Sequence, residues 1–457
     1  MKEPERVQSV AREQAVLVRV VTTNDSSVQD PLEELDGLAT TAGTTVVGGL
    51  VQRLSAPNYA TYLGKGKLEE LRLLVEARDA DVVIFDNDLN PAQTRNLEKA
   101  LEVKVIDRTE LILDIFASNA QTHESRLAVE LAQLEYSLPR LKRMWTHLSR
   151  QKMGVGMRGP GEKQLEVDRR LVEKRIHDLR SELKTIESRR ERQVAARSEQ
   201  MSVSLVGYTN AGKSTLMNAL TEADVLVQDK LFATLDTRTR RWQLPNWGPV
   251  LLSDTVGFIR DLPHRLIASF KATLEEARQT DLLLHVADAS TPAVYDQISA
   301  VYAVLEEIGI QEKDTLLILN KIDRLPENSS LTALMNRYPN AVPISAKEQI
   351  GFEQLGYRVS DALSHSFRDI DVETGVENGR LMAYLAAHGD VLSKRCVGLR
   401  MIIHCRLPQK FLGRITDAGT EIRYRDVHEE AKGGPPRLSE TEVPSACVSS
   451  SVDEQAD

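Results

Sequence analysis

The sequence is poor in cysteine and has no long apolar run. Its three cysteines, Cys396, Cys405 and Cys447, form no Cys-x-x-Cys pair, and its nine histidines form no His-Glu-x-x-His motif. This argues against a disulfide framework and a structural zinc site, and it fits a reducing compartment. No apolar run reaches the roughly 18 residues of a transmembrane helix, and the charged N-terminus MKEPERVQSV lacks the apolar core of a secretory signal. We therefore expect a cytoplasmic protein with no transmembrane segment.

The rest of the composition is typical of a soluble protein with several domains. Hydrophobic residues make up 41% of the 457 residues, charged residues make up 27%, and the net charge is -9. A chain of this length is expected to form about two to four domains. Because the whole chain is acidic, a nucleic-acid-binding surface has to be sought in a local basic region.

The first 118 residues alternate strand patterns with helix patterns. The strand patterns are AVLVRVV, TTVVGGLV, DVVIFDN and VKVID, and the amphipathic helix patterns are LEELRLLVEARD and PAQTRNLEKAL. Pro91 stands at the beginning of the second helix pattern, where the first turn tolerates proline. This alternation predicts a small parallel α/β domain over residues 1–118.

Residues 119–200 carry two heptad patterns. The first consists of Leu127, Leu131, Leu134, Leu138, Leu141, Trp145 and Leu148, and the second consists of Leu165, Val172, Ile176, Leu179, Leu183 and Ile186. Two such helices joined by a loop would cover each other's apolar stripe, which predicts an antiparallel hairpin. Trp145 is interpreted as part of this packing rather than as a base-stacking residue.

The loop between these helices, residues 149–166, is rich in glycine and basic residues. Residues 141–200 contain 16 Lys and Arg but 9 Asp and Glu, although the whole chain is acidic. A merely solvated hairpin is the alternative interpretation, but such a hairpin usually balances its charges, so the excess favours contact with nucleic-acid phosphates. The candidate contacts are Arg150, Lys152, Arg158, Lys163, Arg169 and Arg170. Phosphate contacts predict salt-dependent binding with little base specificity.

A phosphate-binding loop opens the next predicted domain, residues 201–368. In MSVSLVGYTNAGKSTLMNAL, a strand pattern leads into Gly207, four further residues and Gly212-Lys213-Ser214, and a helix pattern follows. Glycines let backbone N–H groups face phosphates, Lys213 offers a positive charge to the β- and γ-phosphates, and Ser214 offers a hydroxyl to Mg²⁺. The flanking strand and helix argue against a chance glycine-rich turn.

Two later motifs select the base. After apolar strand patterns come Asn320, Lys321 and Asp323, and then Ser345, Ala346 and Lys347. An Asp carboxylate can accept two hydrogen bonds from guanine, whereas adenine offers no such pair of donors on that edge. Because ligands of α/β sheets bind at the carboxyl ends of the strands, these motifs predict a site for GTP or GDP.

The γ-phosphate sensors are expected in the segments LFATLDTRTR and SDTVGFI. Asp254 would hold Mg²⁺ through water, and the Gly257 N–H would contact the γ-phosphate. Thr234 is the expected second hydroxyl ligand of Mg²⁺, and the residues alone leave Thr237 and Thr239 open as alternatives.

Phe258 stands where many nucleotide hydrolases have a glutamine that orients the attacking water. Because Phe258 cannot orient water by hydrogen bonding, the missing function has to come from a partner or from a cation. Asn210 is a candidate ligand for K⁺, which would neutralise charge in the transition state, and a simple capping role for Asn210 is the equal alternative. The catalytic candidates are thus Lys213, Asn210 and Gly257, while His285, in an apolar run, is interpreted as a core histidine.

Residues 369–425 predict a small α+β domain. GRLMAYLAAHGDVLSK has a helix pattern and GLRMIIHCRL has a strand pattern. Residues 426–457 are polar and rich in Pro, Gly and Ser, and we expect them to be disordered. The expected architecture is α/β: a P-loop GTPase domain preceded by a small parallel α/β domain and an antiparallel helical hairpin, with a small α+β C-terminal domain.

These motifs together resemble the HflX family of bacterial ribosome-associated GTPases. The resemblance covers about residues 10 to 365 and rests on YLGKGK, LNPAQTRNLE, VIDRTELILDIFA, VELAQLEYSLPRL, RGPGEKQLEVDRR, GYTNAGKST, LFATLD, DTVGFI and NKID. The LEY helix and the RGPGE loop are specific to the family, whereas many GTPases share the other nucleotide motifs. The chain departs from the family pattern at Lys163 and at Met153-Gly154, both in the basic loop.

The resemblance implies a GTPase that binds the large (50S) ribosomal subunit, reaches its rRNA with the hairpin loop and dissociates stalled or idle ribosomes. We then expect a monomer when free, with slow hydrolysis that the ribosome stimulates. Mg²⁺ ligation falls on Ser214 and Thr234. The implied GTP contacts are Gly207, Tyr208, Thr209, Asn210, Ala211, Gly212, Lys213, Ser214, Phe232, Ala233, Thr234, Leu235, Asp236, Asp254, Thr255, Val256, Gly257, Asn320, Lys321, Ile322, Asp323, Ser345, Ala346 and Lys347.

Two other functions compete with this one. A regulatory GTPase that acts on a protein partner would be expected to present an apolar patch rather than a basic, glycine-rich hairpin. An RNA-modification GTPase would need a reactive cysteine or a cofactor site near its RNA-binding arm, whereas the first cysteine of this chain is Cys396.

Overall fold

A computed structural model describes most of the chain. The described residues are 10, 12–22, 30–144, 160–196, 200–221, 231–232, 235, 237–245, 248–260, 277–307, 309–310, 315–325, 328–364, 367–413, 415 and 420–425. The expected disorder of residues 426–457 lies outside them. The chain divides into two compact units, Met1–His365 and Ser366–Asp457. In the described ranges, no helix is long and apolar enough to cross a membrane.

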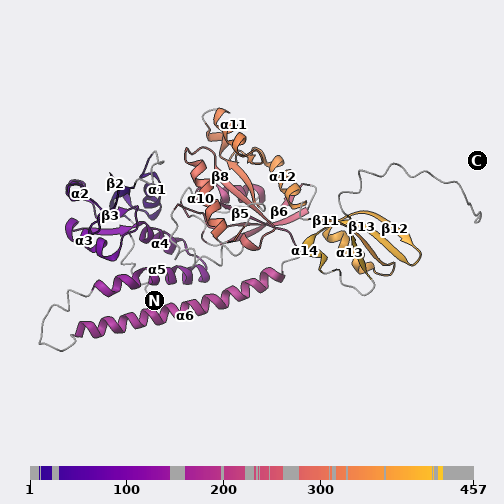
Figure 1. Ribbon diagram of the computed structural model, residues 1–457, viewed down its shortest axis with the longest axis horizontal. Coiled ribbons are helices and arrows are strands. Elements are labelled where there is room, and N and C mark those ends of the chain that lie inside the picture. Colours follow the sequence, from indigo (N-terminus) through magenta and orange to yellow (C-terminus); the bar gives the residue numbers. More distant parts are fainter. Residues whose placement is uncertain are drawn as a thin grey trace, which may run out of the picture. The chain divides into compact units, whose positions relative to one another are not determined.

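The predicted parallel sheet forms the N-terminal part of the first unit (Figure 1). Its strand order is β2-β1-β3-β4, and every neighbouring pair is parallel. The strands are β1 (Gln14–Val21), β2 (Thr45–Arg53), β3 (Val82–Phe85) and β4 (Lys104–Asp107). The helices are α1 (Glu33–Ala42), α2 (Lys65–Arg78), α3 (Pro91–Leu101) and α4 (Arg108–Asn119). This arrangement confirms the predicted α/β alternation.

The apolar core of this part lies on both faces of the sheet. Val16 and Val18 of β1 belong to one buried cluster together with side chains of α2 and α3, such as Leu71. Leu17, which points to the opposite face, belongs to a second cluster with side chains of α1 and α4, such as Leu38. Both faces are therefore covered, as parallel sheets require.

Helix α3 begins at Pro91, as the sequence predicted. The side chain of Asn90 accepts hydrogen bonds from the N–H groups of Ala92 and Gln93, and the Gln93 side chain accepts one from the Asn90 N–H. This reciprocal capping box fixes the start of the helix.

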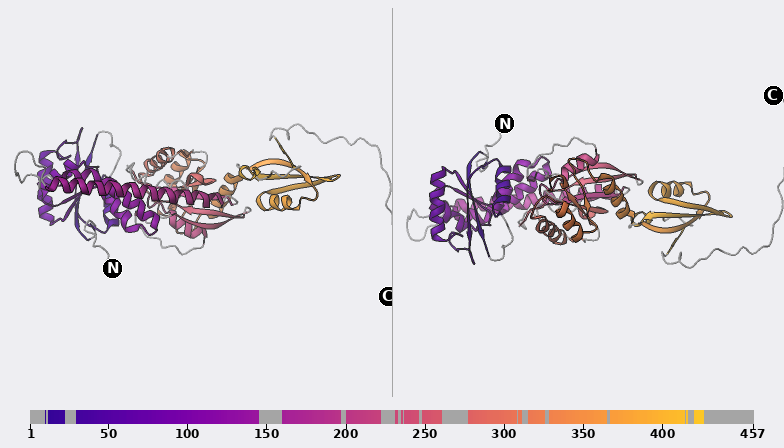
Figure 2. Two further views of the ribbon diagram at one scale, coloured as in Figure 1. Left: turned by 90° about the horizontal axis from the view of Figure 1, so that it is seen from below. Right: turned by 90° about the horizontal axis from the view of Figure 1, so that it is seen from above.

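The predicted helical hairpin follows α4. Helices α5 (His123–Met144) and α6 (Pro160–Ala196) share a buried seam of Leu127, Leu131, Ile176 and Leu179. His123, at the start of α5, lies 3.3 Å from Glu182, whereas Glu130, further along α5, pairs with Arg175. Because later residues of α5 meet earlier residues of α6, the helices are antiparallel. Figure 1 shows them side by side, and the left view of Figure 2 shows the length of α6.

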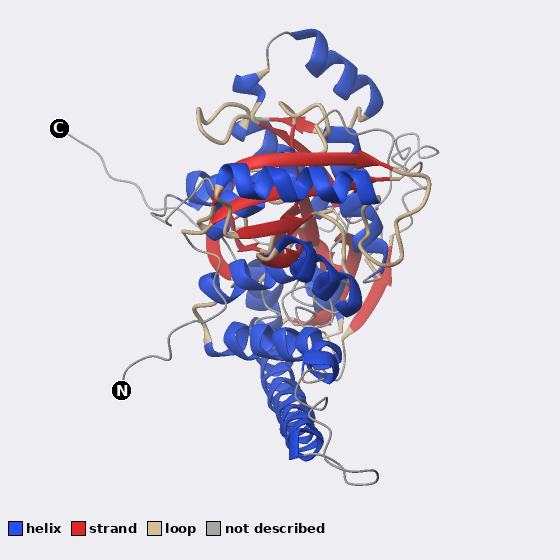
Figure 3. Ribbon diagram, turned by 90° about the vertical axis from the view of Figure 1, so that its left-hand side faces the viewer, coloured by secondary structure: helices blue, strands red, loops and turns tan. Residues whose placement is uncertain are grey.

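A six-stranded sheet forms the centre of the rest of the first unit (Figure 1) and lies behind the N-terminal sheet in the view of Figure 3. Its order is β10-β9-β8-β5-β7-β6, and only β6 is antiparallel to its neighbour among the described strands. The strands are β5 (Ser202–Gly207), β6 (Arg238–Leu244), β7 (Gly248–Asp254), β8 (Leu282–Asp288), β9 (Thr315–Asn320) and β10 (Val342–Pro343). The α-helices are α7 (Lys213–Thr221), α10 (Val294–Glu307), α11 (Asn328–Arg337) and α12 (Phe352–Ser364). The parallel strands bring their carboxyl ends to one edge, where the nucleotide motifs follow them.

The second unit is an antiparallel sheet in the order β12-β13-β11-β14. It consists of β11 (Phe367–Gly375), α13 (Gly379–His388), β12 (Asp390–Val397), β13 (Arg400–Pro408), α14 (Gln409–Leu412) and β14 (Glu421–Tyr424). This confirms the predicted α+β class.

The single helix predicted from GRLMAYLAAHGDVLSK is wrong in its second half. Helix α13 ends at His388, and the residues from Asp390 onward form β12. A Cβ atom on Gly389 would lie 2.5 Å from the Arg406 backbone oxygen of β13. The close strand contact thus requires glycine, and pairing of β12 with β13 outweighs the local helical pattern.

Candidate functional site

The phosphate-binding loop connects β5 to α7 and packs closely on its neighbours. A Cβ atom on Gly207 would lie 2.1 Å from the Val286 carbonyl oxygen, and one on Gly212 would lie 2.4 Å from Asn320 Nδ2. Both glycines also have positive φ angles, of 149° and 91°. Only glycine therefore fits these positions.

Three residues other than glycine around this sheet edge also adopt left-handed φ angles. They are Asn210 (59°), Phe232 (56°) and Lys321 (63°). Such conformations are uncommon for residues with a side chain, and they concentrate at binding and catalytic sites. Left-handed angles also occur in the N-terminal part, where Asp79 and Glu102 end helices α2 and α3, so they accompany the nucleotide motifs but do not by themselves mark the site.

Lys213 lies inside the loop with 6% of its surface exposed. Its Nζ donates hydrogen bonds to the carbonyl oxygens of Gly207 (3.1 Å) and Tyr208 (2.9 Å). Burial lowers its pKa to about 8, the charge of Asp254 acts in the opposite direction, and the charge of Lys321 lowers the pKa further. No described carboxylate forms an ion pair with Lys213, so a phosphate would supply the missing counter-charge.

Ser214 and Asp254 bring a hydroxyl and a carboxylate together beside the phosphate-binding loop. The Ser214 hydroxyl donates a hydrogen bond of 2.6 Å to Asp254 Oδ2. A hydroxyl and a carboxylate suit Mg²⁺, which binds few protein oxygens and keeps phosphate and water as its other ligands. The described residues contain no cluster of three or more His, Cys, Asp or Glu that could hold a metal ion by themselves. Thr234, the other predicted ligand, lies outside the described residues, as do Ala233 and Asp236, and Thr239 hydrogen-bonds Ser253 (3.0 Å).

Asn320 joins the two base-selecting motifs to the phosphate-binding loop. Its Nδ2 donates to the Ala211 carbonyl (2.8 Å), and its Oδ1 accepts from the Ala346 N–H (2.9 Å). The Ser345 hydroxyl donates to Asp323 Oδ1 at 2.6 Å, which orients the carboxylate predicted to bind guanine. The structure thus brings together the motifs that the sequence places far apart.

The sequence reasoning missed Asp288, which follows the apolar run of β8. Its Oδ2 lies 2.8 Å from Lys321 Nζ and holds that side chain beside the base-selecting motif. The position of Asp288 at the carboxyl end of a parallel strand was the available signal. His285, on the same strand, is buried, and burial lowers its pKa to about 3, as expected of a neutral core histidine.

Phe258 is buried, with 3% of its surface exposed, and belongs to an apolar cluster that includes Phe232 and, on α4, Phe116. Its backbone pairs with the phosphate-binding loop: the Phe258 N–H donates to Gly207 and its carbonyl accepts from Thr209. The bulky side chain at the position of the missing glutamine therefore serves packing. The adjacent Thr255 hydroxyl donates to the Leu205 carbonyl and has a structural role.

The segment before Thr234 rests on the N-terminal α/β part. The rings of Phe232 and Phe116 meet edge to face, with centroids 4.7 Å apart. Asn119 Nδ2 donates to the Phe232 carbonyl (2.9 Å), and the Leu231 N–H donates to the Thr41 hydroxyl of α1 (3.2 Å). The Phe232 N–H in turn donates to the hydroxyl of Thr209 in the phosphate-binding loop (2.9 Å).

The segment after Gly257 rests on the same part. The Tyr208 hydroxyl donates to Glu34 Oε2 of α1 (2.8 Å) and accepts from the Arg260 N–H (2.8 Å). The Arg108 guanidinium donates to the Arg260 carbonyl (3.0 Å) and pairs with Glu34 and Asp86. Burial, followed by the Glu34 charge, raises the pKa of Tyr208, so its hydroxyl stays protonated and keeps both contacts.

Two side chains of helix α5 bind the carboxyl end of β4. The Tyr136 hydroxyl donates to Asp107 Oδ1 (2.7 Å), Arg140 pairs with Asp107 Oδ2 (2.9 Å), and the Arg140 guanidinium lies over the Tyr136 ring. Nearby, burial and the Asp107 charge raise the pKa of Glu110 to about 7. We call Asp86, Asp107, Arg108, Tyr136 and Arg140 the strand-end cluster. The LEY motif therefore has a structural task at this cluster.

The predicted RNA contacts are only partly described. Arg150, Lys152 and Arg158 lie outside the described residues, and so does the side chain of Lys163. Arg169 pairs with Glu173 one turn along α6, with 2.7 Å between Nε and Oε1, and Arg170 is exposed.

Comparisons with known proteins identify the family. Three family models match the chain: "GTP-binding GTPase N-terminal" over residues 29–117, "GTP-binding GTPase Middle Region" over residues 119–197 and "50S ribosome-binding GTPase" over residues 202–321. The curated GTPase HflX of Escherichia coli K12 is 48% identical, over 81% of this chain and 88% of its own length. GTPase HflX of Magnetococcus marinus is 44% identical, over 91% and 98%.

A solved structure is also similar. It is a GTP-binding protein from the hyperthermophilic archaeon Sulfolobus solfataricus in complex with GDP, 25% identical, with a TM-score of 0.42. The similarity covers 77% of this chain and 99% of that one.

Proposed function

The chain belongs to the HflX family of GTPases, and on this premise we propose that it binds the large ribosomal subunit and dissociates stalled or idle ribosomes. One observation carries the proposal beyond the family's ribosome-binding GTPase activity. The segments on both sides of the predicted γ-phosphate sensors lie against the part that carries the hairpin, through Phe232 and Arg260. A change at the nucleotide can therefore reach the hairpin through direct contacts.

The proposed coupling has three steps. GTP and Mg²⁺ would order the sensors through Ser214, Thr234, Asp254 and the Gly257 N–H, and hydrolysis would release them. The contacts of Tyr208 and Arg108 with Glu34 would pass this change to the N-terminal sheet. The strand-end cluster would pass it to α5, because Tyr136 and Arg140 join that helix to β4.

The proposed RNA contact is the basic tip of the hairpin, with Arg150, Lys152, Arg158, Lys163, Arg169 and Arg170 as candidates. These side chains would bind rRNA phosphates, so binding would weaken steeply as salt is raised. The protein would act in the cytoplasm and would be a monomer when free.

The proposed hydrolysis uses Lys213 and the Gly257 N–H to stabilise charge on the γ-phosphate. Asn210 is exposed in the loop, and its amide oxygen is the proposed ligand of K⁺. Phe258 supplies no group for the water, so we propose that K⁺ or the ribosome completes the site. Phosphate release with and without ribosomes, in potassium and in sodium buffer, separates these two sources.

The binding proposal is tested by sucrose-gradient sedimentation with separated ribosomal subunits. With a non-hydrolysable GTP analogue, the protein should move with the large subunit, and with GDP it should do so less. Arg170→Glu should weaken the association, whereas Arg380→Glu, an exposed arginine of the second unit, is the matched control. The absence of any shift of the wild-type protein toward the large subunit would refute the proposal.

A further inference from the structure

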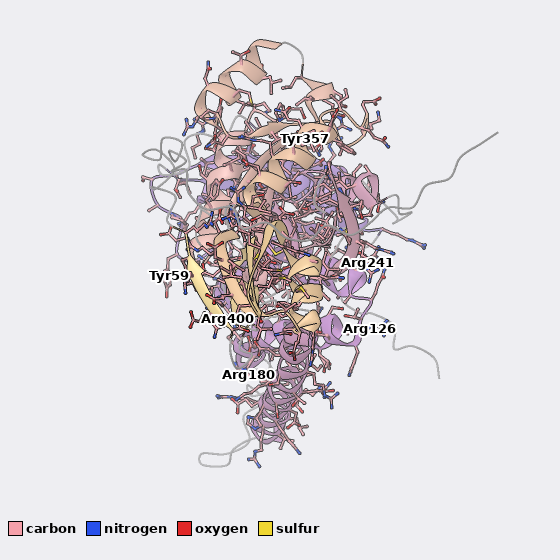
Figure 4. All side chains as sticks on the ribbon, turned by 90° about the vertical axis from the view of Figure 1, so that its right-hand side faces the viewer. Tyr59, Arg126, Arg180, Arg241, Tyr357 and Arg400 are labelled. Carbon is pink, nitrogen blue, oxygen red and sulfur yellow. The ribbon has the colours of Figure 1, made fainter. Side chains whose placement is uncertain are left out.

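An exposed tyrosine stands on the loop between β2 and α2, outside the basic hairpin. Tyr59 has 92% of its surface exposed, more than any other large apolar or aromatic residue that the structure describes. Figure 4 labels it, together with Tyr357 of α12, which is 49% exposed. Neither the nucleotide site nor the strand-end cluster uses Tyr59.

The backbone around Tyr59 is held by its own turn. Asn58 and Tyr62 exchange two backbone hydrogen bonds, of 3.1 and 2.9 Å. The Asn58 side chain accepts from the N–H groups of Ala60 (2.8 Å) and Thr61 (3.3 Å), which closes the turn.

Side chains of helix α3 also hydrogen-bond to the backbone of this turn. Gln93 Nε2 donates to the carbonyl oxygens of Asn58 (3.2 Å) and Tyr59 (3.3 Å), and Asn96 Nδ2 donates to that of Ala60 (2.9 Å). Gln93 is itself fixed, because its other amide atom caps α3. The ring of Tyr59 is thus presented to solvent by a backbone that is already ordered.

Such a ring suits a flat partner. An aromatic side chain on a fixed backbone loses little conformational entropy when it binds, and its exposed faces can be covered by one planar group. Within the turn, Ala60 and Thr61 are small, and Tyr62 packs against the apolar cluster that contains Val16. Tyr59 is therefore not part of an apolar patch of the kind that protein partners cover.

The two helices next to the turn each carry an exposed lysine, although α3 also carries the exposed Glu98. Lys65 opens α2 three residues after Tyr62, and the first turn of that helix has no acidic residue. Lys99 lies one turn after Asn96 on the neighbouring helix α3. Both lysines are exposed, and neither makes an ion pair with a described residue.

We infer that Tyr59 stacks on an unpaired base of RNA while Lys65 and Lys99 contact the flanking phosphates. Stacking on an aromatic ring with cations along the backbone is the general chemistry of single-stranded RNA binding. The inference rests on the proposed function, because rRNA is the RNA expected near the N-terminal part. It adds a second RNA contact, separate from the hairpin tip.

The first test measures the affinity of the full-length protein for large ribosomal subunits in the presence of the GTP analogue. Tyr59→Ala should weaken binding about ten-fold, the order of effect expected for one stacked aromatic residue. Tyr59→Phe should bind as the wild type does, because it keeps the ring. Tyr357→Ala is the matched control and should leave the affinity unchanged.

The salt dependence separates stacking from phosphate contact. Tyr59→Ala should leave the slope of log affinity against log salt unchanged, whereas Lys65→Ala should reduce it by about one phosphate contact. If Tyr59→Ala binds as tightly as the wild type, the inference is overturned while the proposed function stands. If the wild-type protein does not bind the subunit at all, it is the proposed function that fails.

A second test does not depend on the ribosome. In a Tyr59→Trp variant, a 12-nucleotide single-stranded RNA should quench the additional tryptophan emission relative to the wild-type protein, as expected for a stacked base. The absence of quenching at every RNA concentration would overturn the inference even if ribosome binding is intact. A blue shift with subunits that persists after nuclease treatment would also overturn it, because it would indicate a protein pocket.

Discussion

The two sheets of the first unit differ at the edge where their parallel strands end. At the edge of the sheet formed by β5, β8 and β9, glycines let the phosphate-binding loop pack closely on its neighbours, and Lys213 has no described ion-pair partner. At the edge of the N-terminal sheet, Arg108 and Arg140 are paired with Asp86, Glu34 and Asp107. The first edge is left open for a ligand, whereas the second is closed by the chain's own side chains.

This difference qualifies the rule that α/β sheets bind ligands at their carboxyl edges. In this chain the nucleotide motifs lie at the edge where Lys213 hydrogen-bonds only carbonyl oxygens and has no described ion-pair partner. Where the edge is neutralised internally, the same geometry joins parts of the protein. The strand-end cluster connects the N-terminal sheet to the hairpin through Tyr136 and to the segment after Gly257 through Arg108.

The largest effect, on the rate of GTP hydrolysis, is expected from removing Lys213, the cation of the open edge. Lys213→Ala should lower the rate of GTP hydrolysis about a thousand-fold, or about 4 kcal/mol, because the γ-phosphate loses a buried positive charge. Lys394→Ala, an exposed lysine of β12 outside the nucleotide site, is the matched control. Phosphate release under single-turnover conditions measures both. Similar rates for Lys213→Ala and the wild type would remove the basis of the comparison.

A substitution at the closed edge should instead lower the stability of the fold. Arg108→Ala leaves the buried Asp86 and the partly buried Glu34 without this partner, which should lower the free energy of unfolding by about 3 kcal/mol. Arg72→Ala removes an exposed ion pair with Glu69 and should cost less than about 1 kcal/mol. Chemical denaturation of the two variants measures the contrast. Equal losses of stability would show that the ion pairs of Arg108 contribute no more than an exposed surface ion pair.

The sequence predicted the open edge better than the closed one, for a physical reason. The phosphate-binding loop is a local pattern, and Gly207, Gly212 and Lys213 must occur at fixed spacing to form it. The partners of the closed edge are remote in sequence: Tyr208 meets Glu34 across 174 positions, and Arg108 meets Arg260 across 152. A local sequence pattern cannot predict contacts between residues that are so far apart in the chain. Likewise, Phe258 was read as a missing catalytic group, and only the fold reveals its packing role.

Local patterns also failed where a long-range pairing overruled them. The helix predicted across Gly389 is wrong because β12 pairs with β13. The roles of the nucleotide-site residues stay predictions, although the structure brings Asn320, Ser345 and Asp323 together as the motifs require. Thr234 and most of the hairpin tip stay predictions outside the described residues.

A pH effect of intermediate size should be confined to the closed edge. The pKa of Glu110 is raised from 4.5 to about 7 by burial first and then by the Asp107 charge, against the opposing effects of Arg140, Tyr136 and Lys104. The folded protein therefore holds this proton more tightly than the unfolded chain. The stability that it contributes is full below about pH 4.5 and is lost as the pH rises through about 7.

Glu110→Gln should remove this dependence. The difference in free energy of unfolding between this variant and the wild type should shift in favour of the variant by about 2 kcal/mol from pH 5 to pH 8. Denaturation of both proteins at the two pH values measures the change, and Glu69→Gln, an exposed carboxylate of α2, is the control. A difference that is the same at both pH values would contradict the raised pKa.

The smallest effect is expected where the two edges meet, at the Tyr208 hydroxyl. Tyr208→Phe keeps the ring but removes the hydrogen bonds to Glu34 and from Arg260. One such contact is worth about 1 kcal/mol, so kcat should fall a few-fold as the segment after Gly257 is held less firmly, while KM for GTP stays unchanged. Tyr357→Phe should change neither constant. A fall in affinity for both GTP and GDP, with kcat unchanged, would instead assign Tyr208 to the binding loop alone. The open edge would then operate without support from the closed one.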